Sequence, residues 1–390
     1  MKRRILVGSG VAGGVGLFLT GLKAANTALV PAARAADAAG SAVAGGVALD
    51  SFAGSDDAKL ASALSYIAQQ TYRPTLLLAN RLHQLSNTYD LFEGLSISGV
   101  GLEREFARQT VVQARGSALF RVPAGQTNNM VKDVTIQNIS FVGSASTSFL
   151  EPVELSSGPI LAYSTIRACG FKLFSTVIQG RLLGVTLQDI YINQGYKTQL
   201  YLAGSDNFIG VGGHFFMDSQ NLSADQYLLR FAHMSRTDVG PLFITGTRAT
   251  GIRVDNGYGI TFSNTKSEAK AGDPSIATQG SAVVVTGGHG VVFRDCWFFN
   301  VMANPTATGT PSLHKGYITV TGGDGVLIAG CRFSGGATFA PTNTPANTPC
   351  VYASGGSVLC RSNLAINGQA LLYRQATAGL INADAAVTTG

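Results

Sequence analysis

One spacing of apolar residues recurs along this chain and limits what it can fold into. Apolar side chains stand at positions i, i+2, i+5 and i+7, so two alternating pairs are separated by a two-residue interruption. The pattern occurs at Leu95, Ile97, Val100 and Leu102; at Val134, Ile136, Ile139 and Phe141; at Val185, Leu187, Ile190 and Ile192; at Val291, Phe293, Cys296 and Phe298; and at Val326, Ile328, Cys331 and Phe333. Each copy predicts two short strands that meet at a bend and point the same side chains inward.

The residues within the interruption favour a bend over a hairpin. Position i+4 holds Asn138, Asp189, Asp295 and Gly330, and these residue types tolerate backbone angles that others avoid. A hairpin would need a turn such as Asn-Gly between the pairs. The strands therefore belong to successive coils of a solenoid, and we predict an all-β fold, a right-handed single-stranded parallel β-helix.

The chain is predicted to have four segments. Residues 1–46 are an N-terminal arm or leader, residues 47–74 a capping segment with a helix, residues 75–375 the β-helix, and residues 376–390 a C-terminal tail. The Thr/Pro/Asn-rich run at 340–349 is predicted to be a surface excursion.

The capping segment carries the one strong helical pattern. Asp56 and Asp57 open it, where the helix dipole favours acids, and Leu60, Leu64 and Ile67 follow at i, i+4 and i+7. We expect this helix to cover the open N-terminal end of the solenoid.

Composition and charge exclude several classes of protein. Charged residues are only 13% and hydrophobic residues 45% of the chain, which excludes disorder and coiled coil. The 48 glycines follow no Gly-X-Y period, which excludes collagen. The formal charge of +6 is concentrated before the first acid, Asp37, and the rest of the chain is nearly neutral. Nucleic-acid binding is therefore not expected.

The N-terminal arm has two interpretations. Basic residues 2–4 precede an uncharged stretch at 5–22, and Ala-Arg-Ala at 33–35 offers a cleavage pattern, as in a twin-arginine export leader. Alternatively, residues 1–46 are retained for attachment or oligomerisation. The stretch is short and glycine-rich for a bilayer span, so no stable membrane span is expected.

The five cysteines predict buried thiols and no disulfide framework, because their number is odd and no C-x-x-C pair occurs. Cys296 and Cys331 share one inward repeat position and predict a core ladder. Asp206, Asp218, Glu268 and Asp273 are too scattered to indicate a calcium site. We predict no metal and no cofactor.

The acids of the repeat do not predict catalysis. Glycoside hydrolysis needs two carboxyl groups about 5–9.5 Å apart, which neighbouring coils can supply. Asp189 and Asp295, however, occupy the bend position that Asn138 and Gly330 also fill, so a structural role is favoured. No catalytic residue is predicted.

Glycan binding is the favoured chemistry for the surface. Sugar sites combine aromatic faces with amide and carboxylate groups on a rigid scaffold, and residues 191–227 are the richest part of the chain in that mixture. The predicted glycan-binding residues are Tyr196, Tyr201, Asp206, Asn207, Asp218, Asn221 and Tyr227.

Two stretches of sequence resemble known families. The segment 47–101, with Phe-Ala-Gly at 52–54, the Asp56 and Asp57 pair and the strand 75–78, resembles the start of pectate-lyase-like β-helix proteins and phage tailspikes, without their usual Gly-Asp-Gly. From Ser51 to about Arg374, the chain is similar to β-helix minor tail proteins of actinobacterial phages and prophages. That likeness rests on the strings at 68–75, 204–207, 239–245 and 251–254.

The resemblance implies a non-enzymatic protein of a virion tail, whose β-helix binds a cell-surface glycan of an actinobacterial host. Its implied partners are other virion tail proteins and two further copies in a homotrimer. The alternative is a twin-arginine-exported, extracellular polysaccharide lyase or glycoside hydrolase, and a third possibility is a purely structural tail component. Gly-His-Gly at 288–290 is similar to a polygalacturonase motif, but it stands where Gly-Asp-Gly at 323–325 precedes the next repeat, which favours a turn.

Overall fold

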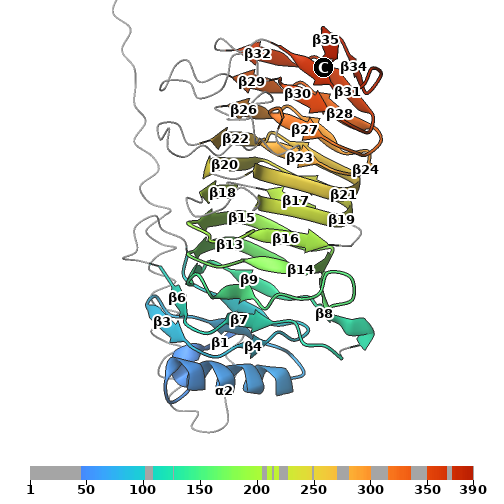
Figure 1. The fold of residues 1–390 in the computed structure, drawn as a ribbon. Helices are drawn as coiled ribbons and strands as arrows, with labels where there is room; N and C mark the ends of the chain where they lie inside the picture. The colour runs from blue at the N-terminus through green and yellow to red at the C-terminus, as the bar shows by residue number, and fades with distance from the viewer. Residues whose placement is uncertain are drawn as a thin grey trace, which may run out of the picture.

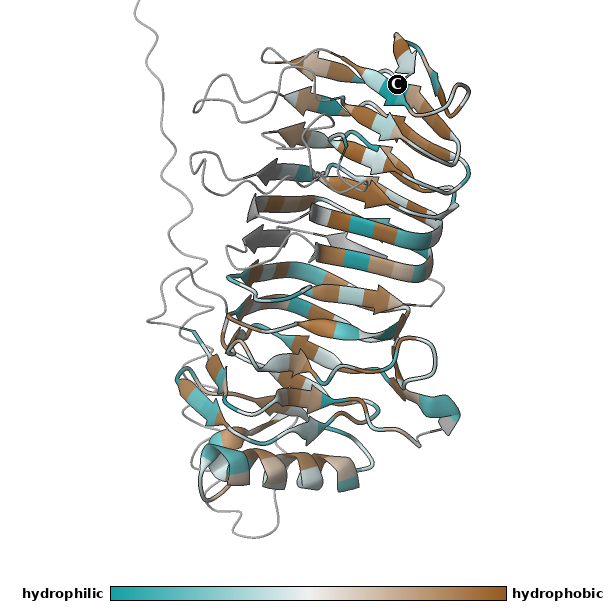
Figure 2. Ribbon diagram, viewed as in Figure 1, coloured by the Kyte–Doolittle hydropathy of each residue, from teal (hydrophilic) through white to brown (hydrophobic). Residues whose placement is uncertain are grey.

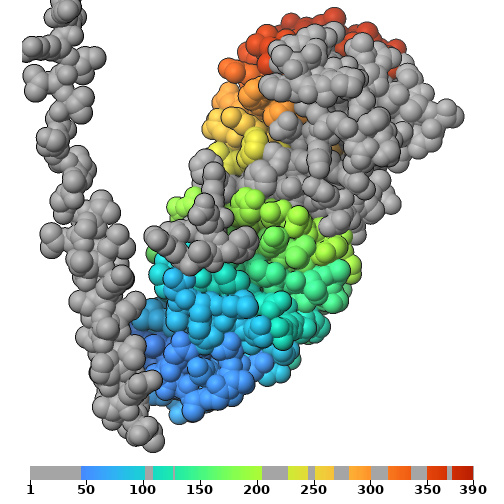
Figure 3. Space-filling view, turned by 90° about the vertical axis from the view of Figure 1, so that its left-hand side faces the viewer, coloured from blue at the N-terminus to red at the C-terminus, as the bar shows by residue number. Residues whose placement is uncertain are grey.

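The computed structural model describes residues 45–101, 109–125, 127–203, 209–212, 215–218, 227–247, 250–269, 281–299, 315–334, 349–366 and 371–389. These residues form a right-handed parallel β-helix, as the repeat predicts, and its coils stack in chain order from one end to the other (Figures 1 and 3). Within them, one 32-stranded sheet winds around the whole solenoid, and a separate three-stranded sheet pairs β4 (Tyr89–Asp90), β7 (Ala118–Arg121) and β11 (Ser148–Leu150).

The large sheet has three faces, named here in the order in which the chain visits them. Face A contains β8 (Met130–Lys132), β12 (Ile160–Ala162), β14 (Ile178–Leu183), β16 (Leu200–Ala203), the starts of β19 (Tyr227–Val239) and β21 (Thr250–Ser263), β23 (Val283–Val285), β27 (Ile318–Val320), β30 (Val351–Ala353), β33 (Tyr373–Gln375) and β35 (Val387–Thr389).

Face B follows face A in each coil. It contains β1 (Gly46–Ala48), β2 (Thr75–Leu77), β5 (Ser96–Ser98), β9 (Thr135–Gln137), the starts of β13 (Thr165–Lys172) and β15 (Thr186–Asn193), β17 (Ile209–Gly212), the ends of β19 and β21, β25 (Val292–Arg294), β28 (Val326–Ala329), β31 (Val358–Arg361) and β34 (Ile381–Ala383). The two-residue strand β24 (Gly288–His289) lies between faces A and B.

Face C completes the coil. It contains β3 (Leu82–Leu85), β6 (Val111–Ala114), β10 (Ser140–Val142), the ends of β13 and β15, β18 (Phe215–Asp218), β20 (Leu242–Thr247), β22 (Lys266–Ala269), β26 (Trp297–Phe299), β29 (Arg332–Ser334) and β32 (Leu364–Ile366). Every pairing along all three faces is parallel, so equivalent residues of successive coils form ladders.

The repeat positions point into the core, with one exception. The copies that begin at Val134, Val185, Val291 and Val326 are buried at all four positions. Aromatic residues stack within this core, as Phe262 does on Phe293 with ring centroids 4.9 Å apart. Figure 2 shows the resulting alternation of apolar and polar residues along the strands.

The exception is the first copy of the repeat. Leu95 and Ile97 are buried, but Val100 is 55% exposed, and Leu102 lies outside the described residues. The chain turns away after Gly99 and passes through Gly101 at φ +134°, and of this second pair the described Val100 belongs to no strand. The prediction that Val100 points inward is therefore wrong.

The bend prediction is confirmed by the backbone angles. Asn138, Asp189, Asp295 and Gly330 all have positive φ, between 52° and 64°. This left-handed conformation disfavours most residues, and Asn, Asp and Gly tolerate it best. The two acids of the repeat therefore serve the bend between faces B and C.

The capping helix α2 (Asp56–Gln69) has Ser55 as its N-cap and buries Leu60, Leu64 and Ile67, as predicted. The short 3-10 helix η1 (Leu49–Ser51) precedes it. The acidic pair does more than interact with the helix dipole. Asp56 accepts a hydrogen bond from the backbone N–H of Gln84, and Asp57 accepts from Ser86 N, so the helix is tied to the first coil of face C.

Both ends of the solenoid differ from the predicted boundaries. At the start, β1, which lies mostly in the predicted capping segment, already pairs with β2 of the solenoid. At the end, β34 and β35 pair with β31 and β33, so the last coil extends beyond residue 375 into the predicted tail. The arm at 1–44 and most of the excursion at 340–349 lie outside the described residues. Among the described helices, none is long and apolar enough to cross a membrane.

The cysteine prediction is confirmed. All five cysteines are free and buried. Cys296 and Cys331 occupy the same inward position on successive coils, next to the paired strands β26 and β29. Burial raises the pKa of the Cys169, Cys350 and Cys360 thiols to about 12.

Candidate functional site

A column of register-equivalent residues, most of them aromatic, runs along face C. Its members, which we call the aromatic column, are placed side by side by the register of β15, β18, β20, β22 and β26: Tyr191, Phe216, Phe243, Lys266 and Trp297. The rungs repeat every ~4.8 Å. Their sequence neighbours Ile192 and Phe298 are buried, so Tyr191 and Trp297 point outward.

The two ends of the aromatic column are open to solvent. Tyr191 is 38% exposed, and Lys266 is exposed beside a half-buried Trp297. The Lys266 ammonium lies 5.6 Å from the centroid of the indole ring, within the range of a cation–π contact. Trp297 also packs on Phe299 with ring centroids 4.9 Å apart. Lys266, Trp297 and Phe299 thus form one packed group at this end of the column.

The indole N–H of Trp297 is buried without a described hydrogen-bond partner. Trp297 Nε1 is a buried donor with no hydrogen-bond partner among the described residues. A buried donor without a partner costs about 1–3 kcal/mol.

A second, more polar column runs beside the first. Its register positions are Asn193, Asp218, Thr245, Glu268 and Phe299. Two acids that are 50 positions apart in the sequence therefore occupy one column, two rungs from each other. The register therefore places amide and carboxyl residue types in the position next to the aromatic residues, and proteins recognise saccharides by a combination of such residue types.

Face A carries a separate charged cluster, which we call the arginine cluster. It consists of Arg230 and Arg253 on neighbouring rungs, the carboxylate of Asp255, and the rings of Tyr201 and Tyr227. Arg230 Nε donates to Asp255 Oδ2 at 2.6 Å, and Arg253 Nε donates to Oδ1 of the same group. Arg253 Nη1 donates to the Tyr227 hydroxyl at 2.6 Å. The Arg230 guanidinium lies 4.5 Å from the Tyr201 ring centroid.

The ion pairs of this cluster favour the charged forms of Asp255 and Arg253. Burial acts to raise the pKa of Asp255, but hydrogen bonds from Arg230 and Arg253 outweigh it and hold the pKa below its ordinary value. Burial acts to lower the pKa of Arg253, and its hydrogen bonds to Asp255 and Tyr227 raise the pKa above the ordinary value. Asp255 and Arg253 therefore both stay ionised at neutral pH.

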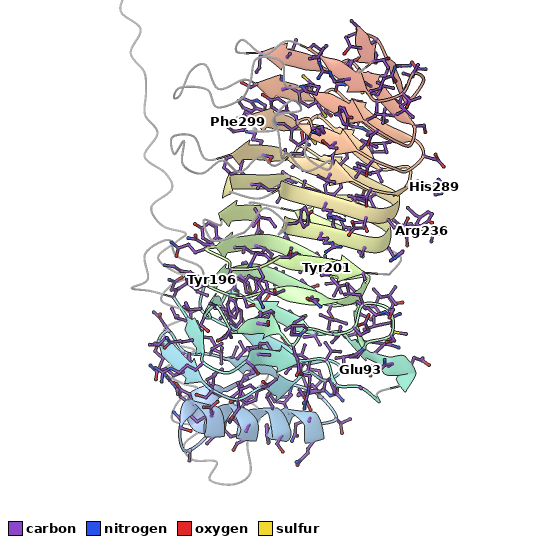
Figure 4. The ribbon with its side chains drawn as sticks, viewed as in Figure 1. Glu93, Tyr196, Tyr201, Arg236, His289 and Phe299 are labelled. Atoms are coloured by element: carbon purple, nitrogen blue, oxygen red, sulfur yellow. The ribbon has the colours of Figure 1, made fainter. Side chains whose placement is uncertain are left out.

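The predicted glycan-binding residues are dispersed over the two faces. Tyr201 belongs to the arginine cluster and is half-buried, and Tyr196 is a half-buried residue of the connection from face C to face A (Figure 4). Asp218 is in the polar column. Tyr227 is 2% exposed and bonds Arg253, so it supports the cluster instead of offering a ring face to solvent. Asp206, Asn207 and Asn221 lie outside the described residues.

Sequence reasoning missed Phe243, Trp297, Arg230 and Arg253. A signal for part of the aromatic column was present, because position i+6 of the repeat, between the two inward residues of the second strand, holds Tyr191 and Trp297. No comparable signal pointed to the arginines, which lie on a face without a recognised repeat.

The histidine of the Gly-His-Gly string lies at a corner, as the turn interpretation predicts. Gly288 and Gly290 have positive φ, and His289 pairs with Asp324 of the next coil. His289 Nδ1 lies 3.5 Å from the Asp324 carboxylate, and both side chains are exposed. His289 lies at the edge of the solenoid (Figure 4). Within the described residues, no three His, Cys, Asp or Glu side chains gather as metal ligands.

Comparison with known proteins supports the fold. No protein-family model and no curated protein matches the chain. The structure is similar to the Agl-KA catalytic domain, with a TM-score of 0.52, 10% identity, and coverage of 90% of this chain and 69% of that one. It is also similar to the A-module of the Azotobacter vinelandii mannuronan C-5 epimerase AlgE4, with a TM-score of 0.50, 12% identity, and coverage of 88% and 99%.

A third similar structure is ORF18 of Geobacillus virus E2, with a TM-score of 0.43, 11% identity, and coverage of 90% of this chain and 63% of that one. Its similarity is too low to support an argument. At such identities the likeness to the Agl-KA domain and to the AlgE4 A-module shows the β-helix fold alone.

Proposed function

We propose that this protein is a glycan-binding β-helix that acts in the tail of a phage or phage-derived particle, without cleaving its ligand. The observation that carries the binding role is the aromatic column of face C. Tyr191 is exposed, and the half-buried Trp297 lies on the outer side of the same sheet face, so this face offers aromatic groups at fixed positions, as saccharide-binding surfaces do. The register places Asn193, Asp218 and Glu268 in the neighbouring column at the same rung spacing.

The tail role is supported by the sequence resemblance to minor tail proteins. In this proposal the ligand is a cell-surface glycan of an actinobacterial host, the chain assembles as a homotrimer with other virion tail proteins, and the location is the virion tail. Light scattering of the purified full chain tests the trimer, and a monomer would contradict it. A native N-terminus near residue 36, found in culture medium instead of particles, would favour the exported protein.

The single tryptophan makes the binding role directly measurable. Because Trp297 is the only tryptophan of the chain, its fluorescence reports on the aromatic column alone. We expect host cell-wall polysaccharide to change that fluorescence saturably. Trp297→Ala and Tyr191→Ala should each weaken binding by at least tenfold in affinity electrophoresis.

Tyr72→Ala is the matched control, since Tyr72 is 80% exposed and lies beside the cap, outside both columns. Its affinity should equal that of the wild type. If Trp297→Ala and Tyr72→Ala behave alike, the aromatic column is not the binding surface.

A second candidate function is glycan cleavage by the polar column. Asp218 and Glu268 stand two rungs apart, so their Cα atoms are about 10 Å from each other. Carboxyl groups about 6.5–9.5 Å apart serve as acid and base in inverting glycosidases. A reducing-end assay on host polysaccharide decides: cleavage that disappears in both Asp218→Asn and Glu268→Gln, with binding retained, would replace the non-enzymatic proposal.

A further inference from the structure

Two arginines of face A share a single counter-charge. Arg230 and Arg253 are register partners on β19 and β21, and both donate their Nε–H to the carboxylate of Asp255. Within the described residues, neither arginine forms an ion pair with any other acid. The cluster therefore carries one positive charge that the described protein does not neutralise.

The terminal guanidinium nitrogens of the two arginines differ in their hydrogen bonding. Arg253 Nη1 is bonded to the Tyr227 hydroxyl. Neither Nη group of Arg230 has a hydrogen-bond partner among the described residues, although its Nε is held by Asp255. The side chain of Arg230 is 28% exposed and that of Arg253 is 19% exposed. Arg230 thus has terminal N–H donors at the surface, while the hydrogen bond from its Nε to Asp255 fixes the position of the guanidinium.

The surroundings keep this geometry in place before any ligand arrives. Asp255 Oδ1 also accepts a hydrogen bond from Thr286 Oγ1 at 3.1 Å, which anchors the carboxylate to the next coil. The Tyr201 ring also lies against the Arg230 guanidinium, with 4.5 Å between the guanidinium carbon and the ring centroid. A guanidinium that is already oriented loses less side-chain entropy on binding.

We propose that Tyr201, Arg230 and Arg253 form a subsite for the carboxylate of an acidic saccharide, a uronate residue of the bound glycan. An arginine fork matches a carboxylate in a bidentate, charge-assisted arrangement. The half-buried Tyr201 ring supplies the apolar face on which a sugar ring packs. This inference rests on the proposed glycan-binding function and names the ligand class for a face other than face C.

The test compares ligands that differ only in charge. Calorimetry with oligogalacturonate and its methyl ester should show at least tenfold tighter binding of the acid by the wild-type chain. This preference should decrease as salt is raised, because partly exposed charges are screened. Arg230→Gln should abolish the preference, whereas Arg230→Lys, which keeps the charge without the fork, should retain part of it.

Arg294→Gln serves as the control, because Arg294 is an exposed arginine on face B, away from the cluster. It should keep the full preference for the acid. Equal binding of acid and ester by the wild type would overturn the subsite, and so would a preference that survives in Arg230→Gln. Tighter binding of galactose 6-sulfate than of monomeric galacturonate would overturn the assignment to a carboxylate.

Monomeric galacturonate separates this inference from the proposed function. It is too small to span from face A to the aromatic column, so Trp297→Ala should not change its affinity. Glycan binding through Trp297 without any acid preference would leave the proposed function intact and reject the subsite. Arg230-dependent acid binding that is unaffected by Trp297→Ala, for polymers as well as monomers, would reject the aromatic column and retain the subsite.

Discussion

The side chain of Asn363 binds the backbone of Cys331 on the preceding coil. Asn363 Oδ1 accepts a hydrogen bond from Cys331 N at 2.9 Å, and Nδ2 donates to Ile328 O at 2.9 Å and to the Tyr373 hydroxyl at 3.2 Å. Asn363 takes the inward position that Cys331 holds one coil earlier. A polar group is stable there because both ends of its amide have partners.

Removing that amide should destabilise the C-terminal coils. Asn363→Ala leaves Cys331 N and Ile328 O without these partners in the core, and we expect a loss of about 1–3 kcal/mol in the free energy of unfolding. Asn382→Ala is the control, because Asn382 is exposed on the next coil and should change stability by less than about 0.5 kcal/mol. Denaturant titration measures both, and equal losses would contradict the buried network.

The inward direction of the repeat positions can be tested by comparing a buried apolar residue with an exposed one. Ile328→Ala removes a fully buried side chain and should cost about 2–5 kcal/mol. Val100→Ala alters a residue of the same sequence pattern that is exposed, and it should cost less than about 0.5 kcal/mol. A large loss from Val100→Ala, or none from Ile328→Ala, would show that the coil register is wrong.

The bend at Asp295 should depend on backbone conformation and not on charge. Its φ is 55°, so Asp295→Asn should leave the melting temperature and any glycan cleavage nearly unchanged. Asp295→Val places a β-branched residue in the left-handed region and should cost about 1–2 kcal/mol. If Asp295→Asn instead abolishes cleavage while the chain stays folded, the residue has a catalytic role.

Acid should weaken the attachment of the N-terminal cap. The hydrogen bond from Arg81 is the largest cause that holds the pKa of Asp50 and of Asp56 below the ordinary value. A depressed folded-state pKa stabilises the protein above the unfolded-state pKa of about 3.9, and this stability is lost as the pH falls further. Melting temperatures from pH 7 down to pH 2 should therefore drop below about pH 4.

Arg81→Met should flatten that acid decline by removing its main cause, whereas Arg294→Met, at an exposed position on face B, should leave its shape unchanged. An identical decline in wild type and Arg81→Met would rule out the cap as its origin.

The thiols should be inert in the folded protein. Burial raises the pKa of Cys169, Cys350 and Cys360 to about 12, so almost no thiolate exists at pH 8. All five cysteine side chains are buried and closed to a reagent in solution, so iodoacetamide at pH 8 should modify none of them in the native chain and all five after unfolding, as counted by mass spectrometry. Rapid modification of one native thiol would show that its coil opens.

How far the sequence predicts this fold depends on which residues fill the inward positions. The copy at Val326 is recognisable because all four inward side chains are apolar. The coil at Ile260 has the same geometry, with Asn264 at the bend in positive φ, but Thr265 and Ser267 take its second pair of inward positions. An apolar pattern does not detect such a coil, although neighbouring coils cover its polar groups.

The sequence by itself determined the solenoid, the bends and the capping helix, because each follows from local spacing and from backbone preferences over about ten residues. Only the tertiary structure decided which outward residues meet. Phe243 precedes Lys266 by 23 positions, and Lys266 precedes Trp297 by 31, yet all three lie on consecutive rungs. Coil length varies with the connections between faces, so the register of the aromatic column and the pairing of Arg230 with Arg253 arise from the stacking of coils and not from a period in the sequence.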